Sequence, residues 1–307
     1  MAPINDDRST VLQMKCPSCG SELGVFPDLE AASIDCSHCQ YAIFWDGACW
    51  DACADKSYPR EFARQWVLWE QGKLGDSSLV YGNVPQDYFK AFLEHSSLTE
   101  EELGSKKILE VGFGHGKFLA ELQRCSPTAY GVDLSRPLVS AQLRPGSAFF
   151  GNLFQIPFEP HQFDLVICRG VIHVTPDPQK AFARLAEQVA EDGLLYVGGL
   201  YEPGKGNLLV RKLFPRIWNY PEFVRLGMAS FFSLFRSAIE CARTRAFSFK
   251  TFKRHFGHYK LDIFDVISPR WTSVHEEAEV IGWYKSLGFV ARKVGYGDYF
   301  GVKETLD

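Results

Sequence analysis

The stretch Lys107-Ile-Leu-Glu-Val-Gly-Phe-Gly-His-Gly116 decides how this sequence folds. Its first half, residues 107–112, is an apolar run with one acid, which predicts a strand, and residues 113–116 predict a glycine-rich turn. Residues 117–123 follow with apolar side chains at helical spacing. A strand, a glycine turn and a helix place backbone N–H groups beside a ligand, so the segment predicts a small-molecule site.

A second strand end supplies a carboxylate for that ligand. Ala129-Tyr-Gly-Val-Asp133 predicts a strand whose last residue lies 21 positions after Gly112, a spacing that suits a carboxylate on ribose hydroxyls. The glycines at 112, 114 and 116 differ from the Gly-x-Gly-x-x-Gly pattern of dinucleotide sites. Glu110 would repel a pyrophosphate, but it can accept a hydrogen bond from a cationic amino group. The pattern therefore favours S-adenosylmethionine, which carries no phosphate, over NAD.

These residues resemble the motifs of the class I S-adenosylmethionine-dependent methyltransferases, and the resemblance covers roughly residues 60–305. Residues 109–116 are similar to the first motif, 131–135 to the second, and 151–158 to the adenine-contacting loop. Further matches are the fourth strand at 163–168, the loop at 170–177 and the fifth strand at 193–199. The resemblance implies an α/β fold with a doubly wound, seven-stranded, mostly parallel sheet. Residues 288–295 and 298–303 independently predict a final hairpin.

The expected donor-binding residues lie along these motifs, and Asn152 stands where many family members have Asp. They are Glu110, Gly112, Gly114, Gly116, Asp133, Leu134, Asn152, Leu153 and Arg169. Methyl transfer is an in-line displacement, so the enzyme mainly positions the two reactants, and a base is needed only for an acceptor that holds its proton. The candidate acceptor-side residues are His173, Tyr201 and His275, with Arg169 and Arg270 as candidates for a substrate carboxylate.

The N-terminal region carries a separate signal for a metal. Cys16-Pro-Ser-Cys19 and Cys36-Ser-His-Cys39 are separated by sixteen residues, and two such turns can surround one Zn²⁺ with four thiolates. We predict a structural zinc on Cys16, Cys19, Cys36 and Cys39, with His38 as a bystander; the alternative is four reduced, buried thiols. Residues 22–26 and 41–45 alternate as short strands do. Cys49 and Cys53 are interpreted as ordinary thiols.

The order of these features divides the chain. We expect a zinc-ribbon module at 1–55, a methyltransferase domain at 56–200 and 263–307, and a helical substrate cap at 201–262, inserted after the fifth strand. Between Gly204 and Lys260 there are twelve Lys or Arg and two acidic residues, a local charge of +10, which leaves −14 for the rest of the chain. That charge leaves four interpretations open: solvated helix faces, an anionic substrate, RNA, or a membrane surface.

Composition limits the remaining classes. The chain has 307 residues, 46% hydrophobic and 23% charged, which is typical of a folded globular protein. It has no apolar run long enough for a membrane span and no secretory signal at its start. Nine cysteines with two Cys-x-x-Cys pairs favour a reducing, cytoplasmic compartment.

The combined features predict an S-adenosylmethionine-dependent methyltransferase (EC 2.1.1) acting on a small organic acceptor, aromatic or anionic. The stretch 265–271 is similar to one found in bacterial enzymes that modify small molecules, and it would place Trp271 and His275 at the pocket. The alternative is a ribosomal-RNA guanine methyltransferase whose zinc module recognises RNA, although the acidic charge outside the cap argues against a long RNA footprint. A third interpretation is a scaffold that docks a protein through its zinc module. The motifs leave the oligomeric state open.

Overall fold

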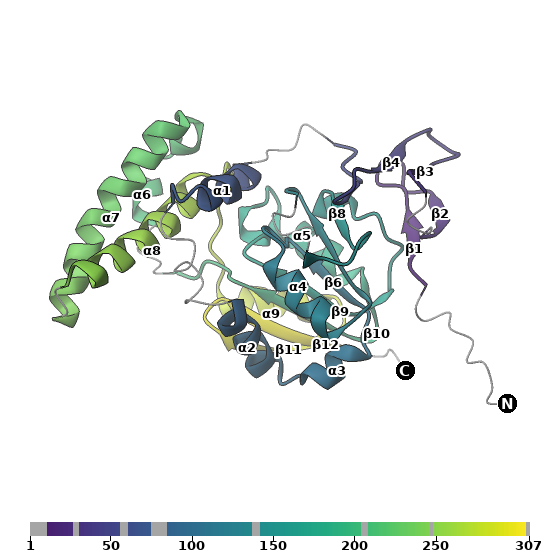
Figure 1. The fold of residues 1–307 in the computed structure, drawn as a ribbon. Helices are drawn as coiled ribbons and strands as arrows, with labels where there is room; N and C mark the ends of the chain where they lie inside the picture. The colour runs from purple at the N-terminus through teal and green to yellow at the C-terminus, as the bar shows by residue number, and fades with distance from the viewer. Residues whose placement is uncertain are drawn as a thin grey trace.

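The computed structural model describes residues 11–26, 31–55, 61–74, 85–136, 142–203, 208–245 and 248–304. Seven strands form its central sheet in the order β11-β12-β10-β9-β6-β7-β8 (Figure 1). Strands β6 to β10 pair in parallel, whereas β12 runs antiparallel to β10 and β11. The strands are β6 Ile108–Val111, β7 Ala129–Asp133, β8 Ala148–Phe150, β9 Phe163–Arg169, β10 Val189–Gly198, β11 Phe289–Gly295 and β12 Asp298–Lys303. This arrangement confirms the predicted doubly wound α/β fold with its terminal hairpin.

Helices cover both faces of this sheet, and each face has its own apolar core. One core packs α2 and α4 against the sheet, and the other packs α5 and α9. Sequence sets the ends of two helices: Thr99 and Glu102 form a capping box on α3, and Asp177 caps α5, whose first residue is Pro178. The helices are α1 Glu61–Glu70, α2 Pro85–Ser96, α3 Glu100–Gly104, α4 Lys117–Cys125, α5 Pro178–Ala186 and α9 Glu277–Ser286, with short 3₁₀ turns η2 Leu153–Gln155 and η3 Ile172–Val174.

The cysteine-rich segment extends the same sheet. Its strands are β1 Gln13–Lys15, β2 Glu22–Val25, β3 Ser33–Asp35, β4 Ala42–Trp45 and β5 Trp50–Asp51. Strand β5 pairs in parallel with β8, and β4 and β3 follow, so three ribbon strands extend the seven predicted strands to a ten-stranded sheet. The extra strands cover the β8 edge, which would otherwise expose unpaired backbone groups. Trp50 and Met14 are fully buried in the core shared with α5.

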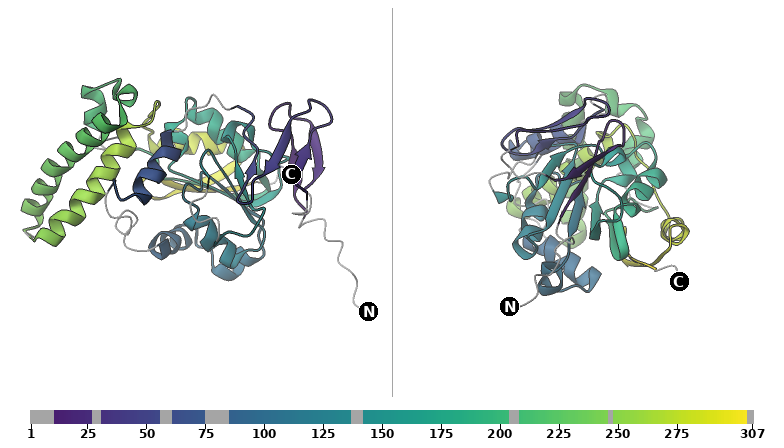
Figure 2. Two further views of the ribbon diagram at one scale, coloured as in Figure 1. Left: turned by 45° about the horizontal axis from the view of Figure 1, so that its top comes forward. Right: turned by 90° about the vertical axis from the view of Figure 1, so that its right-hand side faces the viewer.

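A helical hairpin projects from the opposite end of the molecule (Figures 1 and 2). It consists of α7 Glu222–Thr244 and α8 Phe249–Ile267, preceded by α6 Leu208–Leu213 and the turn η4 Ile217–Asn219. Helix α8 lies between α7 and the body, and α6 packs against α8. Among the described residues no helix is long and apolar enough to cross a membrane.

Candidate active site

The turn after β6 requires glycine for steric reasons. Gly112 has φ +90°, and a Cβ added there would lie 2.2 Å from Cγ2 of Val171. Gly116 also has φ +90° and begins α4 without a side-chain cap. The sequence therefore positions an open backbone turn at the carboxyl end of β6, the edge at which ligands bind in parallel α/β sheets.

Two carboxylates lie beside this turn. Asp133, at the end of β7, accepts hydrogen bonds from the backbone N–H of Gly114 at 2.8 Å and from the backbone N–H and hydroxyl of Ser135 at 2.5 Å each. Burial raises the pKa of Asp133, although these hydrogen bonds oppose the rise. Glu110 is 6% exposed, and burial together with the nearby Asp133 raises its pKa well above the ordinary range. Its Oε2 has no hydrogen-bond partner among the described residues.

A cavity of about 280 Å³ opens from this turn toward the helical hairpin. The strand side of its wall includes Gly112, Gly114, Asp133, Leu134, Gly151, Leu153 and Arg169. The helix side is formed by Gln65 and Trp66 of α1 and by His258, Leu261, Asp262 and Asp265 of α8. One side of the cavity is thus a strand edge suited to a nucleoside, and the opposite side is a partly acidic wall formed by the helices.

Six of the nine expected donor residues line this cavity, and three do not. Glu110, Gly116 and Asn152 are outside the lining. Asn152 is buried, and its side-chain oxygen accepts a hydrogen bond from the backbone N–H of Phe154 at 3.0 Å, which caps η2. That oxygen therefore shapes the loop that carries Leu153 into the cavity wall.

Tyr201 and His173 lie behind the wall. The Tyr201 hydroxyl donates to Oδ2 of Asp265 at 3.0 Å, and the amide nitrogen of Gln65 donates to Oδ1 at 2.9 Å. The rings of His173 and Tyr201 are 4.1 Å apart. Burial and the adjacent Asp265 raise the pKa of Tyr201 well above its usual range, so this hydroxyl stays protonated. Neither predicted side chain lines the cavity: Tyr201 contacts Asp265 of the cavity wall, and His173 contacts Tyr201.

His275 and Arg270 take other partners. One ring nitrogen of His275 lies 2.7 Å from the Ser273 hydroxyl, and the other lies 3.1 Å from Glu279. Its backbone N–H donates to the Tyr201 carbonyl at 2.8 Å, which fixes the segment after α8. The Arg270 guanidinium lies 5.4 Å from the ring centre of Trp218. His275, Arg270 and Trp271 do not line the cavity.

Among the polar residues of the cavity wall, the sequence did not point to Gln65, Asp262 or Asp265 as site residues. The signal for the two acids was present, because they are the only acidic residues in α8. Their separation by three positions puts both on one side of the helix. Gln65 carried no such signal, because its role depends on where α1 packs.

Aromatic side chains cover the glycine turn. Trp66 lies against Gly114, where an added Cβ would approach its ring to 2.7 Å. The His115 ring stacks on Trp69 at 5.3 Å and meets Trp66 edge-on at 4.8 Å. Burial, helped by the charge of Lys117, lowers the pKa of His115 to about 4. A neutral imidazole therefore belongs to the aromatic cover at neutral pH.

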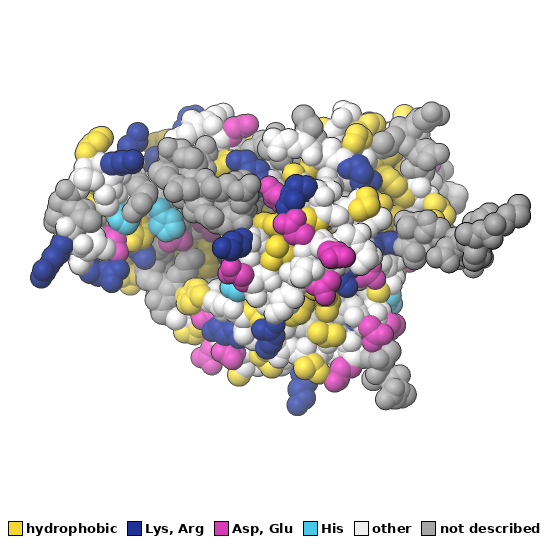
Figure 3. Space-filling view, turned by 60° about the horizontal axis from the view of Figure 1, so that its bottom comes forward, with side chains coloured by type: hydrophobic (Ala, Val, Ile, Leu, Met, Phe, Trp, Pro, Cys, Tyr) yellow, Lys and Arg dark blue, Asp and Glu magenta, His cyan; other side chains and the backbone are white. Residues whose placement is uncertain are grey.

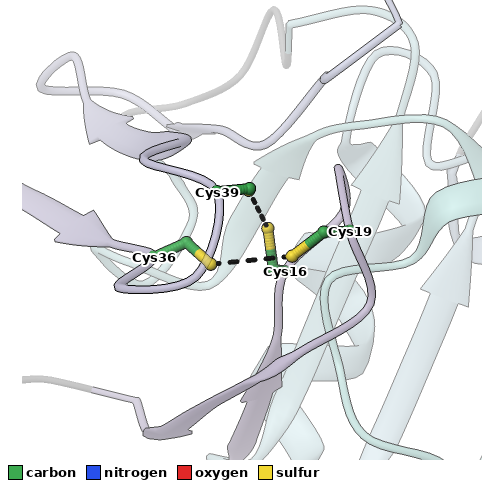
Figure 4. A group of neighbouring side chains, drawn as sticks. All are labelled: Cys16, Cys19, Cys36 and Cys39. Carbon is green, nitrogen blue, oxygen red and sulfur yellow. Dashed lines mark hydrogen bonds between the residues drawn. The ribbon is translucent and has the colours of Figure 1, made fainter.

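The four cysteines form a compact cluster (Figure 4). All four sulfur atoms lie within 4.8 Å of one another, with 3.6 Å between Cys16 and Cys39 and 3.7 Å between Cys19 and Cys36. Tetrahedral zinc with bonds of about 2.3 Å requires sulfur atoms about 3.8 Å apart. The cluster therefore has the donors and spacing for one zinc ion. His38 is exposed and outside the cluster.

Comparison with known proteins identifies the central domain. The family described as "Methyltransferase domain" matches residues 109–197. The chain is 32% identical over 122 residues to the "Ubiquinone biosynthesis O-methyltransferase" of Salmonella paratyphi A, a match that covers 36% of this chain and 50% of that protein. It is also 32% identical over 138 residues to the "Phthiotriol/phenolphthiotriol dimycocerosates methyltransferase 1" of Mycobacterium ulcerans, covering 42% of this chain and 50% of that protein. The chain thus spans about half the length of these curated relatives.

Among solved structures, the magnesium protoporphyrin IX methyltransferase of Synechocystis PCC 6803 is similar with a TM-score of 0.47 and 17% identity, covering 81% of this chain and all of that one. The strand order, the glycine turn with its two carboxylates and the family match at 109–197 agree with one another. The chain therefore contains a class I S-adenosylmethionine-dependent methyltransferase domain.

Proposed function

We propose that the protein transfers the methyl group of S-adenosylmethionine to a small organic acceptor. The observation that carries this proposal is a cavity whose wall includes both Gly112 and Asp133 and the carboxylates of α8. The strand side has the features of a donor site, and the hairpin closes the acceptor side. We infer that residues 201–262, together with the rest of α8, act as the substrate cap.

The donor-side residues fit S-adenosylmethionine. The unpartnered Oε2 of the buried Glu110 would accept a hydrogen bond from the donor's amino group, which removes the cost of a buried unsatisfied oxygen. Ser135 donates two hydrogen bonds to Oδ1 of Asp133, whereas Oδ2 accepts one, from the Gly114 N–H, and keeps a lone pair that can accept from a ribose hydroxyl. When bound, the donor supplies an electrophilic methyl group on its sulfonium. The chain's residues hold that methyl in line with the acceptor.

On the acceptor side, Asp265 is the best-placed group to receive a proton. It lines the cavity, and Gln65 and Tyr201 hold one carboxylate oxygen each. Since Tyr201 stays protonated, it acts as a positioning residue, and His173 packs behind it. An acceptor O–H or N–H that meets the Asp265 carboxylate would lose its proton as the new bond to the methyl carbon forms.

The wall also narrows the acceptor class. Trp66, Leu261 and Val174 offer apolar and aromatic contact, whereas Asp262 and Asp265 would repel an anion. These residues favour an acceptor with an aromatic or flat apolar body and a neutral or cationic protic group at its reacting end. Of the two acceptor properties expected from sequence, the aromatic one therefore has support here, and an anionic group would have to point away from α8.

We also infer that the cysteine cluster binds Zn²⁺ in a closed, structural site. Four sulfur ligands fill the tetrahedral positions, so the ion would stabilise the ribbon and would not contact a substrate.

Calorimetric titration with S-adenosylmethionine and S-adenosylhomocysteine tests the donor site. We expect micromolar affinity, and Glu110→Gln should weaken it by about 10- to 100-fold, the value of a charge-assisted hydrogen bond. Glu94→Gln is the matched control, because Glu94 is exposed on α2. No binding to the folded wild-type chain would reject the methyltransferase proposal.

Turnover with an acceptor found by mass-shift screening tests the acceptor side. Asp265→Asn should lower kcat by about 10²- to 10⁴-fold and leave the affinity for S-adenosylhomocysteine unchanged. Asp192→Asn, an exposed carboxylate on β10, is the control. An unchanged kcat in Asp265→Asn would exclude the proposed proton transfer while leaving the donor site intact.

A further inference from the structure

Helix α7 presents an uninterrupted apolar surface to solvent. Every exposed residue from Phe223 to Ala242 is apolar or glycine, and Phe223 and Ile239 are 76% and 66% exposed. This apolar row extends about 28 Å along the helix. It consists of Phe223, Gly227, Phe231, Leu234, Phe235, Ala238, Ile239 and Ala242. A surface of this kind on a folded protein marks an interaction site.

Helix α7 buries small side chains and exposes several large apolar ones, the reverse of the usual arrangement. Its buried positions are Ala229, Ser233, Ser237 and Cys241, spaced four residues apart. These small side chains let α7 approach α8 closely, and the two serine hydroxyls donate to carbonyls of α7 itself at 2.8 and 2.7 Å. Leu226, Met228 and Phe232 still pack against the core, but the large side chains of the apolar row point away from the protein. The outward row is a property of the sequence and does not result from incomplete packing of a core.

Charge around the row favours one kind of partner. Residues 236–254, which include the end of α7 and the start of α8, contain six Lys or Arg and one Glu. That Glu240 pairs with Arg243 at 2.7 Å. Figure 3 shows Lys and Arg side chains gathered at the end of the molecule formed by the hairpin. A second copy of the chain would bring a surface of the same sign, whereas an anionic partner complements it.

We propose that α7 binds the surface of an anionic membrane. Phe231, Leu234 and Phe235 would enter the boundary between headgroups and acyl chains, and the exposed Arg245, Lys250 and Lys253 would contact lipid phosphates. The row contains no polar side chain, as burial in lipid requires. Helix α7 lies on the surface in this arrangement, in agreement with the absence of a membrane-spanning helix among the described residues.

The same hairpin connects this surface to the cavity. Helix α8 packs along α7 and contributes Leu261, Asp262 and Asp265 to the cavity wall. Membrane contact through α7 would hold the acceptor side of the cavity close to the lipid. The proposal does not depend on methyl transfer, because vesicle binding is measured without a donor or an acceptor.

Co-sedimentation of the full chain with vesicles tests the proposal. We expect binding to vesicles that contain phosphatidylglycerol, weaker binding to phosphatidylcholine alone, and loss of binding as salt increases. Phe231→Glu and Phe235→Glu should each reduce the vesicle partition coefficient by about tenfold or more. Val290→Glu is the control, because Val290 is a 59% exposed apolar residue on β11. Lys250→Gln combined with Lys253→Gln should weaken binding to the anionic vesicles alone.

Binding of S-adenosylhomocysteine by each variant verifies that it is folded. Absence of binding to either vesicle type would overturn the proposal. So would a dimer, measured by light scattering, that Phe231→Glu dissociates in a chain without affinity for vesicles; that result would assign the row to a second copy. Equal binding of the wild type, Phe231→Glu and Phe235→Glu to anionic vesicles would also overturn it, since charge elsewhere would then be sufficient.

Discussion

Removal of zinc should unfold the whole protein and not the ribbon alone. The perturbation is Cys36→Ser, which deletes one of four sulfur donors. A structural zinc site in a small module contributes roughly 10–16 kcal/mol to its folded form. Without the ion, the two cysteine turns lose the bonds that hold them together. Because few residues separate these turns from the sheet, their loss of structure should extend to the sheet.

The size of the effect follows from the core that the ribbon shares with the methyltransferase domain. Besides the small Ala52, five large ribbon side chains in that core are at most 8% exposed. They are Leu12, Met14, Ile34, Ile43 and Trp50. At roughly 1.5–3 kcal/mol each, their burial is worth up to about 7–15 kcal/mol, as large as the net stability of a typical domain. The ribbon therefore cannot detach while the rest stays folded.

Differential scanning calorimetry with a donor-binding assay measures this coupling. We expect one transition for the zinc-loaded chain, a fall in Tm of more than about 10 °C for Cys36→Ser, and loss of S-adenosylhomocysteine binding. Cys125→Ser is the control, because Cys125 lies outside the cluster on α4. Two separate transitions, or a zinc-free chain that still binds S-adenosylhomocysteine with the wild-type Tm, would show that the ribbon and the methyltransferase domain unfold independently.

Three smaller changes test the region around the glycine turn. Gly112→Ala should destabilise the fold by about 2–4 kcal/mol in urea unfolding, because it combines φ +90° with a contact to Val171; unchanged stability would mean that the turn rearranges. Between pH 6.5 and pH 4 the unfolded chain binds a proton at His115 that the folded chain does not bind. The free energy of unfolding should therefore decrease by up to about 3 kcal/mol as the pH is lowered through this range, and His115→Gln should remove this part of the pH dependence. Arg64→Ala should change stability by less than about 1 kcal/mol, since its pair with Glu222 is exposed; a larger loss would show that α1 depends on this contact.

The parts of the fold that depend on local sequence were predicted closely. The strand over 107–112 is observed at Ile108–Val111, and the helix over 117–123 extends to Cys125. Glycine positions, apolar spacing and the two cysteine turns all act within a few residues, so a single sequence contains their physical causes. The hairpin of β11 and β12 belongs to the same group, because its turn and strands are contiguous.

The parts that depend on distant pairing were not predicted. Strand β5 has two residues and joins β8, which lies about a hundred positions further along the chain. No periodicity can reveal so short a strand, so the ribbon was expected to be a separate module. His275 illustrates the same limit: its backbone N–H donates to the carbonyl of Tyr201, which is distant in sequence, and the residue lies outside the cavity lining.

The charge of the cap was interpreted as one property, but the structure divides it between surfaces. The segment 204–260 has a charge of +10, but α8 continues to Ile267 and contributes two carboxylates beyond that segment, Asp262 and Asp265, to the cavity wall. A helix can present opposite charges on opposite sides, because residues three or four apart share a face and the others do not. Six of the twelve Lys and Arg of this segment lie within 236–254, and none of the twelve is among the described residues that line the cavity. Salt should therefore weaken vesicle binding while leaving donor affinity nearly unchanged, and equal salt sensitivity of both would show that the cap's basic charge reaches the cavity.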